Sequence, residues 1–220
     1  MNIREKLNRI RAPKPLSHPV LARILFAFFA LFSGGALGWA AKELDRAWMW
    51  KKTFGYIGSY LGQLGSQLGI WIFLATLLAI YSPTHISAAY HVLLFFLAML
   101  ATYYLHTALI EGFFFKRVVF AWTIIALFSP LCGWCVWFSR GKGYIAAVCA
   151  AVPISLLFTE GYPFFYTGNI LLGFDIAAAI LLYFLTAQGK KQKIMALPFI
   201  AVFFILFEST NFLSLVFGGL

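Results

Sequence analysis

Acidic residues are scarce in this chain. Only 7 of its 220 residues are Asp or Glu, and charged residues of both signs make up 11% of the sequence. Soluble domains average about 25% charged residues. With 62% hydrophobic residues and a mean hydropathy of +0.87, the chain has too little polar surface to cover a water-soluble globule. The composition therefore excludes a soluble globular protein and predicts a membrane protein.

Cysteine is also scarce, and the common catalytic motifs are absent. The three cysteines all lie in apolar runs, which excludes an extracellular disulfide framework. Cys132 and Cys135 form a Cys-x-x-Cys pair, which we interpret as small packing residues, with a redox pair as the weaker alternative. The sequence contains no metalloprotease motif, no serine nucleophile elbow and no phosphate-binding loop. We expect no catalytic residue, no cofactor and no metal site, which favours a protein that is not an enzyme.

Basic residues are in excess, and the formal net charge is +10. They stand in short clusters between apolar runs, as in the loops of polytopic membrane proteins, so we do not expect nucleic-acid binding. One cluster lies in residues 1–19, where Leu7 and Ile10 fall near one helical face. This segment is either a basic amphipathic helix on the cytoplasmic leaflet or a disordered basic tail. A cleaved signal peptide is disfavoured because the next apolar run is long enough to span a membrane.

The apolar runs predict an all-α fold, a polytopic bundle of about seven transmembrane helices within residues 20–220. The expected spans are 20–41, 64–82, 86–110, 118–138, 143–160, 169–187 and 194–217. The glycine-rich residues 54–66 either extend the second span or form an interfacial or re-entrant half-helix. One helix over 54–82 would be about 43 Å long. The hydrocarbon core is about 30 Å thick, so a strong tilt or a break is expected there.

The distribution of basic residues predicts the orientation. With the N-terminus inside, the 17 Lys and Arg divide into eleven on the cytoplasmic side and six on the outer side. An excess of Lys and Arg marks cytoplasmic loops. We therefore expect the N-terminus inside, the C-terminus outside, and a multi-pass protein of the bacterial plasma membrane.

Five glycines recur at spacings of 3, 4, 3 and 4, which places them along one side of a helix. They are Gly55, Gly58, Gly62, Gly65 and Gly69. Glycines would weaken a soluble helix by about 1 kcal/mol each relative to Ala. In a bilayer, small residues at this spacing let two helix backbones approach closely. We interpret these five residues as a helix-packing face.

Four runs carry a resemblance to a known family. They are Gly69–Thr76 (GIWIFLAT), Leu97–His106 (LAMLATYYLH), Glu111–Lys116 (EGFFFK) and Trp137–Gly143 (WFSRGKG). Over about residues 20–217 the chain resembles a family of small bacterial integral membrane proteins known chiefly as a domain of unknown function. The resemblance implies a polytopic helical protein of the bacterial plasma membrane. It implies no activity and no catalytic residue.

Four acids lie in or at the ends of expected spans: Glu111, Glu160, Asp175 and Glu208. A charge inside a membrane costs several kcal/mol unless it is paired, hydrated or neutralised, so such residues are candidates for a functional site. Asp175 and Glu208 lie at similar depth on neighbouring spans, and we expect them to share an outward-facing cavity. The alternative is structural: Asp175 hydrogen-bonds another helix, while Glu111 and Glu160 are hydrated at the interface.

Two more polar residues join this candidate ligand-binding set. His106 follows Tyr103 on the third span and lies near Glu111, so the three could line a polar outer cavity. Asn211 adds a polar group at the level of the acids. The alternative for His106 is an interfacial histidine with one satisfied nitrogen.

These patterns support two main hypotheses of function. The first is a protein that binds or transports a small cationic solute through an outward-facing polar cavity. The second is a non-transporting accessory or immunity-type protein that docks another membrane protein, or a second copy of itself, through its glycine face. An enzyme acting on lipid or thiol is the weakest of the three hypotheses. In each case the lipid bilayer is the expected surrounding partner.

Overall fold

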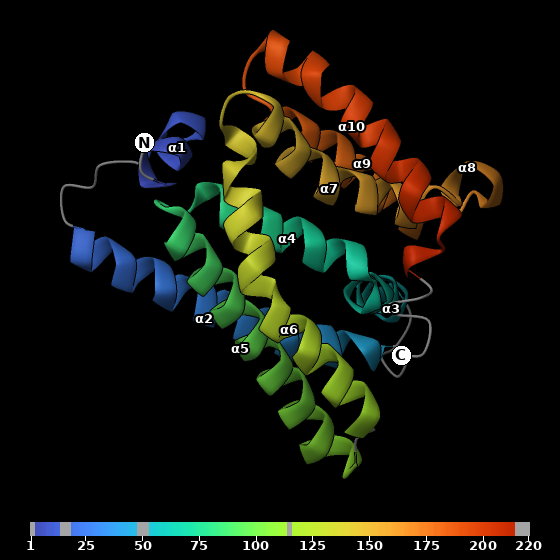
Figure 1. Cartoon of the computed structure of the whole chain (residues 1–220). Helices are drawn as coiled ribbons and strands as arrows, with labels where there is room; N and C mark the ends of the chain where they lie inside the picture. The colour runs from blue at the N-terminus through green and yellow to red at the C-terminus, as the bar shows by residue number, and fades with distance from the viewer. Residues whose placement is uncertain (1–2, 14–18, 48–52, 114–115, 214–220) are drawn as a thin grey trace.

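The chain folds into helices only, as far as the structure describes it. The computed structural model describes residues 3–13, 19–47, 53–113 and 116–213 (Figure 1). The elements are α1 (Ile3–Ile10), α2 (Pro19–Asp45), α3 (Thr53–Ser66), α4 (Leu68–Tyr81), α5 (His85–Glu111), α6 (Lys116–Trp137), the 3-10 turn η2 (Phe138–Arg140), α7 (Tyr144–Gly161), α8 (Phe164–Thr167), α9 (Ile170–Thr186) and α10 (Lys190–Ser209). The all-α prediction is confirmed for these residues.

Five helices are long and apolar enough to cross a membrane, namely α2, α5, α6, α7 and α10. A sixth span results if α3 and α4 are counted together. The structure thus supports five or six spans rather than the expected seven, because α9 has only 17 residues and is about 26 Å long. The end of the expected span 194–217 lies partly outside the described residues.

The break expected within residues 54–82 is present, so residues 64–82 do not form one unbroken helix. The chain breaks at Gln67, whose backbone is extended, and α3 and α4 enclose a bend of 69°. The Gly65 carbonyl accepts a hydrogen bond from the Trp71 indole nitrogen at 2.8 Å. Across the break, a side chain from α7 binds the first backbone N–H of α4. These two contacts satisfy helix-end groups that an unbroken helix would satisfy internally.

The helices α2 and α5 run parallel and pack closely. A Cβ on Gly34 would collide with the Phe95 carbonyl, and one on Gly38 would collide with the Met99 carbonyl. The Thr102 hydroxyl donates to the Gly35 carbonyl at 2.8 Å. Residues further along α2 thus contact residues further along α5, as expected for parallel helices. Small residues allow this backbone contact in a membrane helix pair.

A second parallel pair is formed by α7 and α10. The Gln192 amide bonds both backbone groups of Gly143 at the beginning of the two helices. Further along, the Ser155 hydroxyl donates to the Ile200 carbonyl at 2.9 Å. The helix α9 packs against α7, and α4 lies between this group and the group of α2, α5 and α6 (Figure 1). One side of α4 therefore faces α7 and α9.

The N-terminal helix α1 is docked on the bundle. Its Leu7 and Ile10 pack against the main cluster of buried side chains. The Arg11 guanidinium donates to the carbonyls of Ile80 (2.8 Å) and Trp137, close to the ends of α4 and α6, and stacks over the Trp137 ring at 4.1 Å. Of the two alternatives for this segment, the structure shows a helix rather than a disordered tail, and this helix contacts the rest of the protein.

Candidate functional site

The break between α3 and α4 brings a carboxylate to a helix N-terminus. The first backbone N–H groups of any helix have no partner within it. At α4 the Leu68 N–H donates to Glu160 Oε1 at 3.0 Å, and Glu160 comes from the end of α7. The positive end of the α4 dipole also favours a negative charge here. The sequence places Glu160 at the end of an expected span, and the structure uses it to bind the start of α4.

Asp175 lies beside Glu160 and is completely buried. It sits in the first half of α9 and is 0% exposed. A Cβ on Gly69 would lie within 3.2 Å of both Asp175 Oδ1 and Glu160 Oε2, so the two carboxylates flank one point. Gly161 leaves room for Asp175 from the other side, because a Cβ added to Gly161 would lie only 3.0 Å from the Asp175 Cβ. Two glycines therefore allow α4 and α7 to close around Asp175.

Several oxygens of this cluster lack a hydrogen-bond partner within the part of the chain that the structure describes. They include both carboxylate oxygens of Asp175 and Oε2 of Glu160. The neighbouring residues Gln67 and Thr159 add an unpartnered amide oxygen and an unpartnered hydroxyl. Buried carboxylates without partners are costly unless they hold a proton or a cation. The chemistry of this site is therefore that of an acceptor for a positive charge.

The ligand set at this site has only two carboxylates. Among the described residues no group of three or more His, Cys, Asp or Glu side chains could hold a metal ion. The three cysteines are free thiols on α6 and α7. The arrangement suits a proton or a small monovalent cation, which needs less charge from its ligands than a divalent metal.

Glu208 and Asn211 lie apart from this cluster. Glu208 is exposed at the end of α10, and its carbonyl accepts from the Asn211 N–H at 3.1 Å. Asn211 itself is exposed, with φ at 47°, beyond the end of the helix. The described residues bring Asp175 to Glu160 rather than to Glu208, because α9 packs on α7 and not along α10. The expected Asp175–Glu208 cavity is not what the structure forms.

Tyr103 and Glu111 line the same pocket, described below, whereas His106 is not part of its lining; Glu111 and His106 each bind α2. Glu111 pairs with Lys42 at 2.7 Å, and His106 Nε2 lies 2.9 Å from Glu43 Oε2. The Tyr103 hydroxyl donates to a third residue of α2, Asp45, at 2.9 Å. These contacts join the C-terminal ends of α2 and α5. Glu43 and Asp45 are functional-site neighbours that sequence reasoning did not single out.

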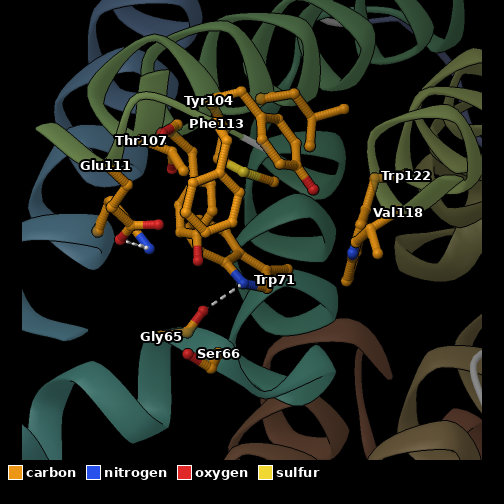
Figure 2. A pocket seen from close by; sticks show the side chains of 13 residues that line it. Gly65, Ser66, Trp71, Tyr104, Thr107, Glu111, Phe113, Val118 and Trp122 are labelled. Carbon is orange, nitrogen blue, oxygen red and sulfur yellow. Dashed lines mark hydrogen bonds and ion pairs between the residues drawn. The ribbon is translucent and has the colours of Figure 1, made fainter. Parts of the chain in front are cut away.

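A pocket of about 260 Å³ opens beside the Lys42–Glu111 pair. Gly65 and Ser66, the last residues before the break, form part of its wall. Figure 2 shows Trp122 of α6 across the pocket from Trp71 of α4. The pocket contacts Gly65, Ser66 and Trp71, and the carboxylate cluster contacts Leu68 and Gly69, so both lie next to the break.

The five glycines of the expected packing face have different neighbours. Gly55 and Gly58 are buried. A Cβ on Gly62 would lie 2.5 Å from the Leu44 carbonyl oxygen, and one on Gly65 would lie 3.1 Å from the Ala41 Cβ, so both glycines face α2. Gly69, beyond the break, faces the acids. The face is thus occupied by α2 at its centre and by the candidate site at its end.

Glu160 and Asp175 were candidates from the sequence, but their partners were not. Leu68 and Glu160 are 92 residues apart, and no spacing in the chain connects them. The one available signal was that Gly69 directly precedes an apolar run, where a glycine permits close approach of another group. Comparison with known proteins adds no relative to this description: no protein-family model, no curated protein and no solved structure matches the chain.

Proposed function

We propose that this is a multi-pass membrane protein that binds a small cation or a proton at Glu160 and Asp175 and takes part in solute transport. The observation that carries the proposal is the state of Asp175. Its carboxylate is fully buried and unpartnered within the described chain, and it faces a second carboxylate across Gly69. Ionisable residues inside a membrane commonly mark ion or substrate pathways.

The broken helix supports the same proposal. Membrane transporters often bind solutes where a spanning helix is interrupted, because the interruption frees backbone groups to act as ligands. Here the interruption lies at Gln67, with Glu160 bound to the next residue. Ser66, on the other side of Gln67, lines the pocket.

The topology that goes with this function has seven crossings, with the N-terminus inside and the C-terminus outside the bacterial plasma membrane. The division of Lys and Arg, eleven against six, supports this orientation. Counting the α3–α4 pair and α9 as one crossing each gives seven. On this topology the pocket beside Lys42 and Glu111 opens toward the outside.

The accessory-protein alternative has no specific observation in its favour. It required a glycine face free to dock a partner, whereas Gly62 and Gly65 pack against α2 of the same chain. We therefore retain cation binding as the proposed function.

The test is Asp175→Asn, which removes the charge but keeps the size of the side chain. The melting temperature of the purified protein is measured from pH 5 to 8, with and without sodium or potassium. We expect the parent to respond to protons or to one of these cations and the variant to lose that response. A cation present at 100 times its Kd would raise the free energy of unfolding of the parent by about 2.7 kcal/mol.

Glu208→Gln is the matched control, because Glu208 is exposed and lies away from the cluster. This variant should respond as the parent does. Equal responses in the parent and in Asp175→Asn would contradict the proposed site. A purely structural Asp175 would show that outcome, since Asn can still form hydrogen bonds there.

A further inference from the structure

The pocket at the outer ends of α2 and α5 has walls rich in aromatic rings. Five of its lining residues are aromatic: Trp71, Tyr103, Tyr104, Phe113 and Trp122. Figure 2 shows Tyr104 and Phe113 on the same side of the pocket as Thr107 and Glu111. Aromatic faces attract ammonium groups within about 6 Å of the ring centre. The Lys42 ammonium, at 5.5 Å from the Tyr103 ring, already makes such a contact.

The charges at this pocket occur as a neutral, partly buried pair. Lys42 Nζ lies 2.7 Å from Glu111 Oε1, and the two side chains are 13% and 34% exposed. A ligand with a single charge would have to separate the pair and leave one partner without a counterion, which is costly for a partly buried group. A ligand with both charges avoids this cost. Its anionic group can bind Lys42 while its ammonium binds Glu111 and the aromatic rings.

The position and size of the pocket narrow the class of ligand. It lies where α2 and α5 end and α6 begins, and all three helices are candidate spans. The ends of spans lie at the level of lipid headgroups. The volume of about 260 Å³ is below the usual range of about 300–1,000 Å³ for drug-sized ligands. It suits a headgroup or an equally small solute.

We propose that this pocket binds a zwitterion that carries an ammonium and an acidic group, such as a phosphoethanolamine headgroup. Lys42 binds the acidic group, and Glu111 with the surrounding rings binds the ammonium. This site is separate from the Glu160–Asp175 cluster. Asp175→Asn should therefore leave zwitterion binding unchanged, so the two proposals can fail independently.

Titration calorimetry on the full chain in detergent tests the proposal. The zwitterionic probes are O-phosphoethanolamine, as a free solute, and dihexanoyl phosphatidylethanolamine, as a lipid. Ethanolamine and dihexanoyl phosphatidylglycerol are the singly charged comparators. We expect at least one zwitterionic probe to bind tenfold or more tightly than both comparators. Binding of the lipid alone identifies a lipid site, and binding of the free solute alone identifies a solute site.

Variants assign the binding to this pocket. Lys42→Gln and Glu111→Gln should each weaken zwitterion binding at least tenfold, whereas Lys116→Gln, an exposed lysine outside the pocket, should stay within twofold. The double variant Lys42→Glu, Glu111→Lys preserves the ion pair, and hence the fold, with the charges exchanged. It should still bind the favoured probe more tightly than ethanolamine. The proposal is overturned if neither zwitterion binds the parent, if a comparator binds equally well, or if both single Gln variants bind like the parent.

Discussion

Gly69 determines how closely α4 can approach α7 and α9. Its position immediately after the helix break leaves room for the carboxylate of Asp175, and a methyl group there would collide with that carboxylate. In an ordinary helix, Ala in place of Gly would be favourable by about 1 kcal/mol. At this residue the close contact should outweigh the helix propensity.

Gly69→Ala should accordingly destabilise the protein, by about 1–3 kcal/mol, the usual range for adding a methyl group to a closely packed site. Gly35→Ala is the control, because a Cβ there would meet the Thr102 side chain at an ordinary 3.4 Å. Thermal unfolding in detergent measures both variants. The double variant Gly69→Ala, Asp175→Ala should recover part of the loss. If Gly69→Ala is as stable as the parent, the Asp175 carboxylate can move away from the added methyl group at little cost.

The sequence singled out Asp175, Glu160 and Gly69 for separate reasons but did not connect them. A lone acid in an apolar run is conspicuous, because burying a charge is costly. Which carboxylate lies beside it depends on the packing of α7, α9 and α4, and hydropathy contains no information on that packing. The prediction of Glu208 as the partner rests on its similar depth on the neighbouring span. Depth places a residue along the membrane normal but not around the bundle.

At the scale of elements, Arg11, the residue after α1, connects the ends of two helices that are far apart in the sequence. Arg11 donates to carbonyls near the ends of α4 and α6, where the last carbonyls of a helix have no internal partner. Burial, together with the nearby Arg140, lowers the pKa of Arg11 to about 10, so it remains charged at neutral pH. The basic composition of this segment was read from the sequence as an orientation signal. That reading does not distinguish a helix-capping arginine from a solvated one.

Arg11→Gln should destabilise the protein by about 2–3 kcal/mol, because hydrogen bonds from a charged donor to buried carbonyls are lost. Arg11→Lys should recover only part of this loss, since an ammonium cannot reproduce the planar fork of the guanidinium. Arg9→Gln, on the exposed side of α1, should melt like the parent. If all three variants have the melting temperature of the parent, the Arg11 contacts do not contribute to stability.

At the scale of the whole molecule, the fold class could be predicted from composition, while the path of the chain could not. The apolar runs located all five long spans, but the C-terminal ends of the expected spans 143–160 and 194–217 differ from the structure by seven and eight residues. The length of residues 54–82 predicted a tilt or a break, but the sequence did not place the break at Gln67, because the groups that stabilise it, Trp71 and Glu160, look like ordinary span residues. The orientation rests on the distribution of Lys and Arg and can be measured directly.

Cysteine labelling in intact cells tests that orientation. In a background with Cys132, Cys135 and Cys149 replaced by Ala, Tyr166→Cys on α8 should react with a membrane-impermeant maleimide. Gln188→Cys, between α9 and α10, should react only after permeabilisation. Both residues are exposed in the structure, so a difference in labelling reports the side of the membrane. The reverse pattern would place the pocket and its ligand on the cytoplasmic side.

The two parallel helix pairs restrict the number of times the chain between them can cross the membrane. If α2 and α5 both span the membrane in the same direction, the chain between them must return to its starting side, which requires an odd number of crossings. The same holds between α7 and α10. If both pairs span in this way, the return paths are the bent α3–α4 pair and the short α9, which carry Gly69 and Asp175. On that topology the segments least able to cross as regular helices are the ones that have to cross, and the acids lie where they meet.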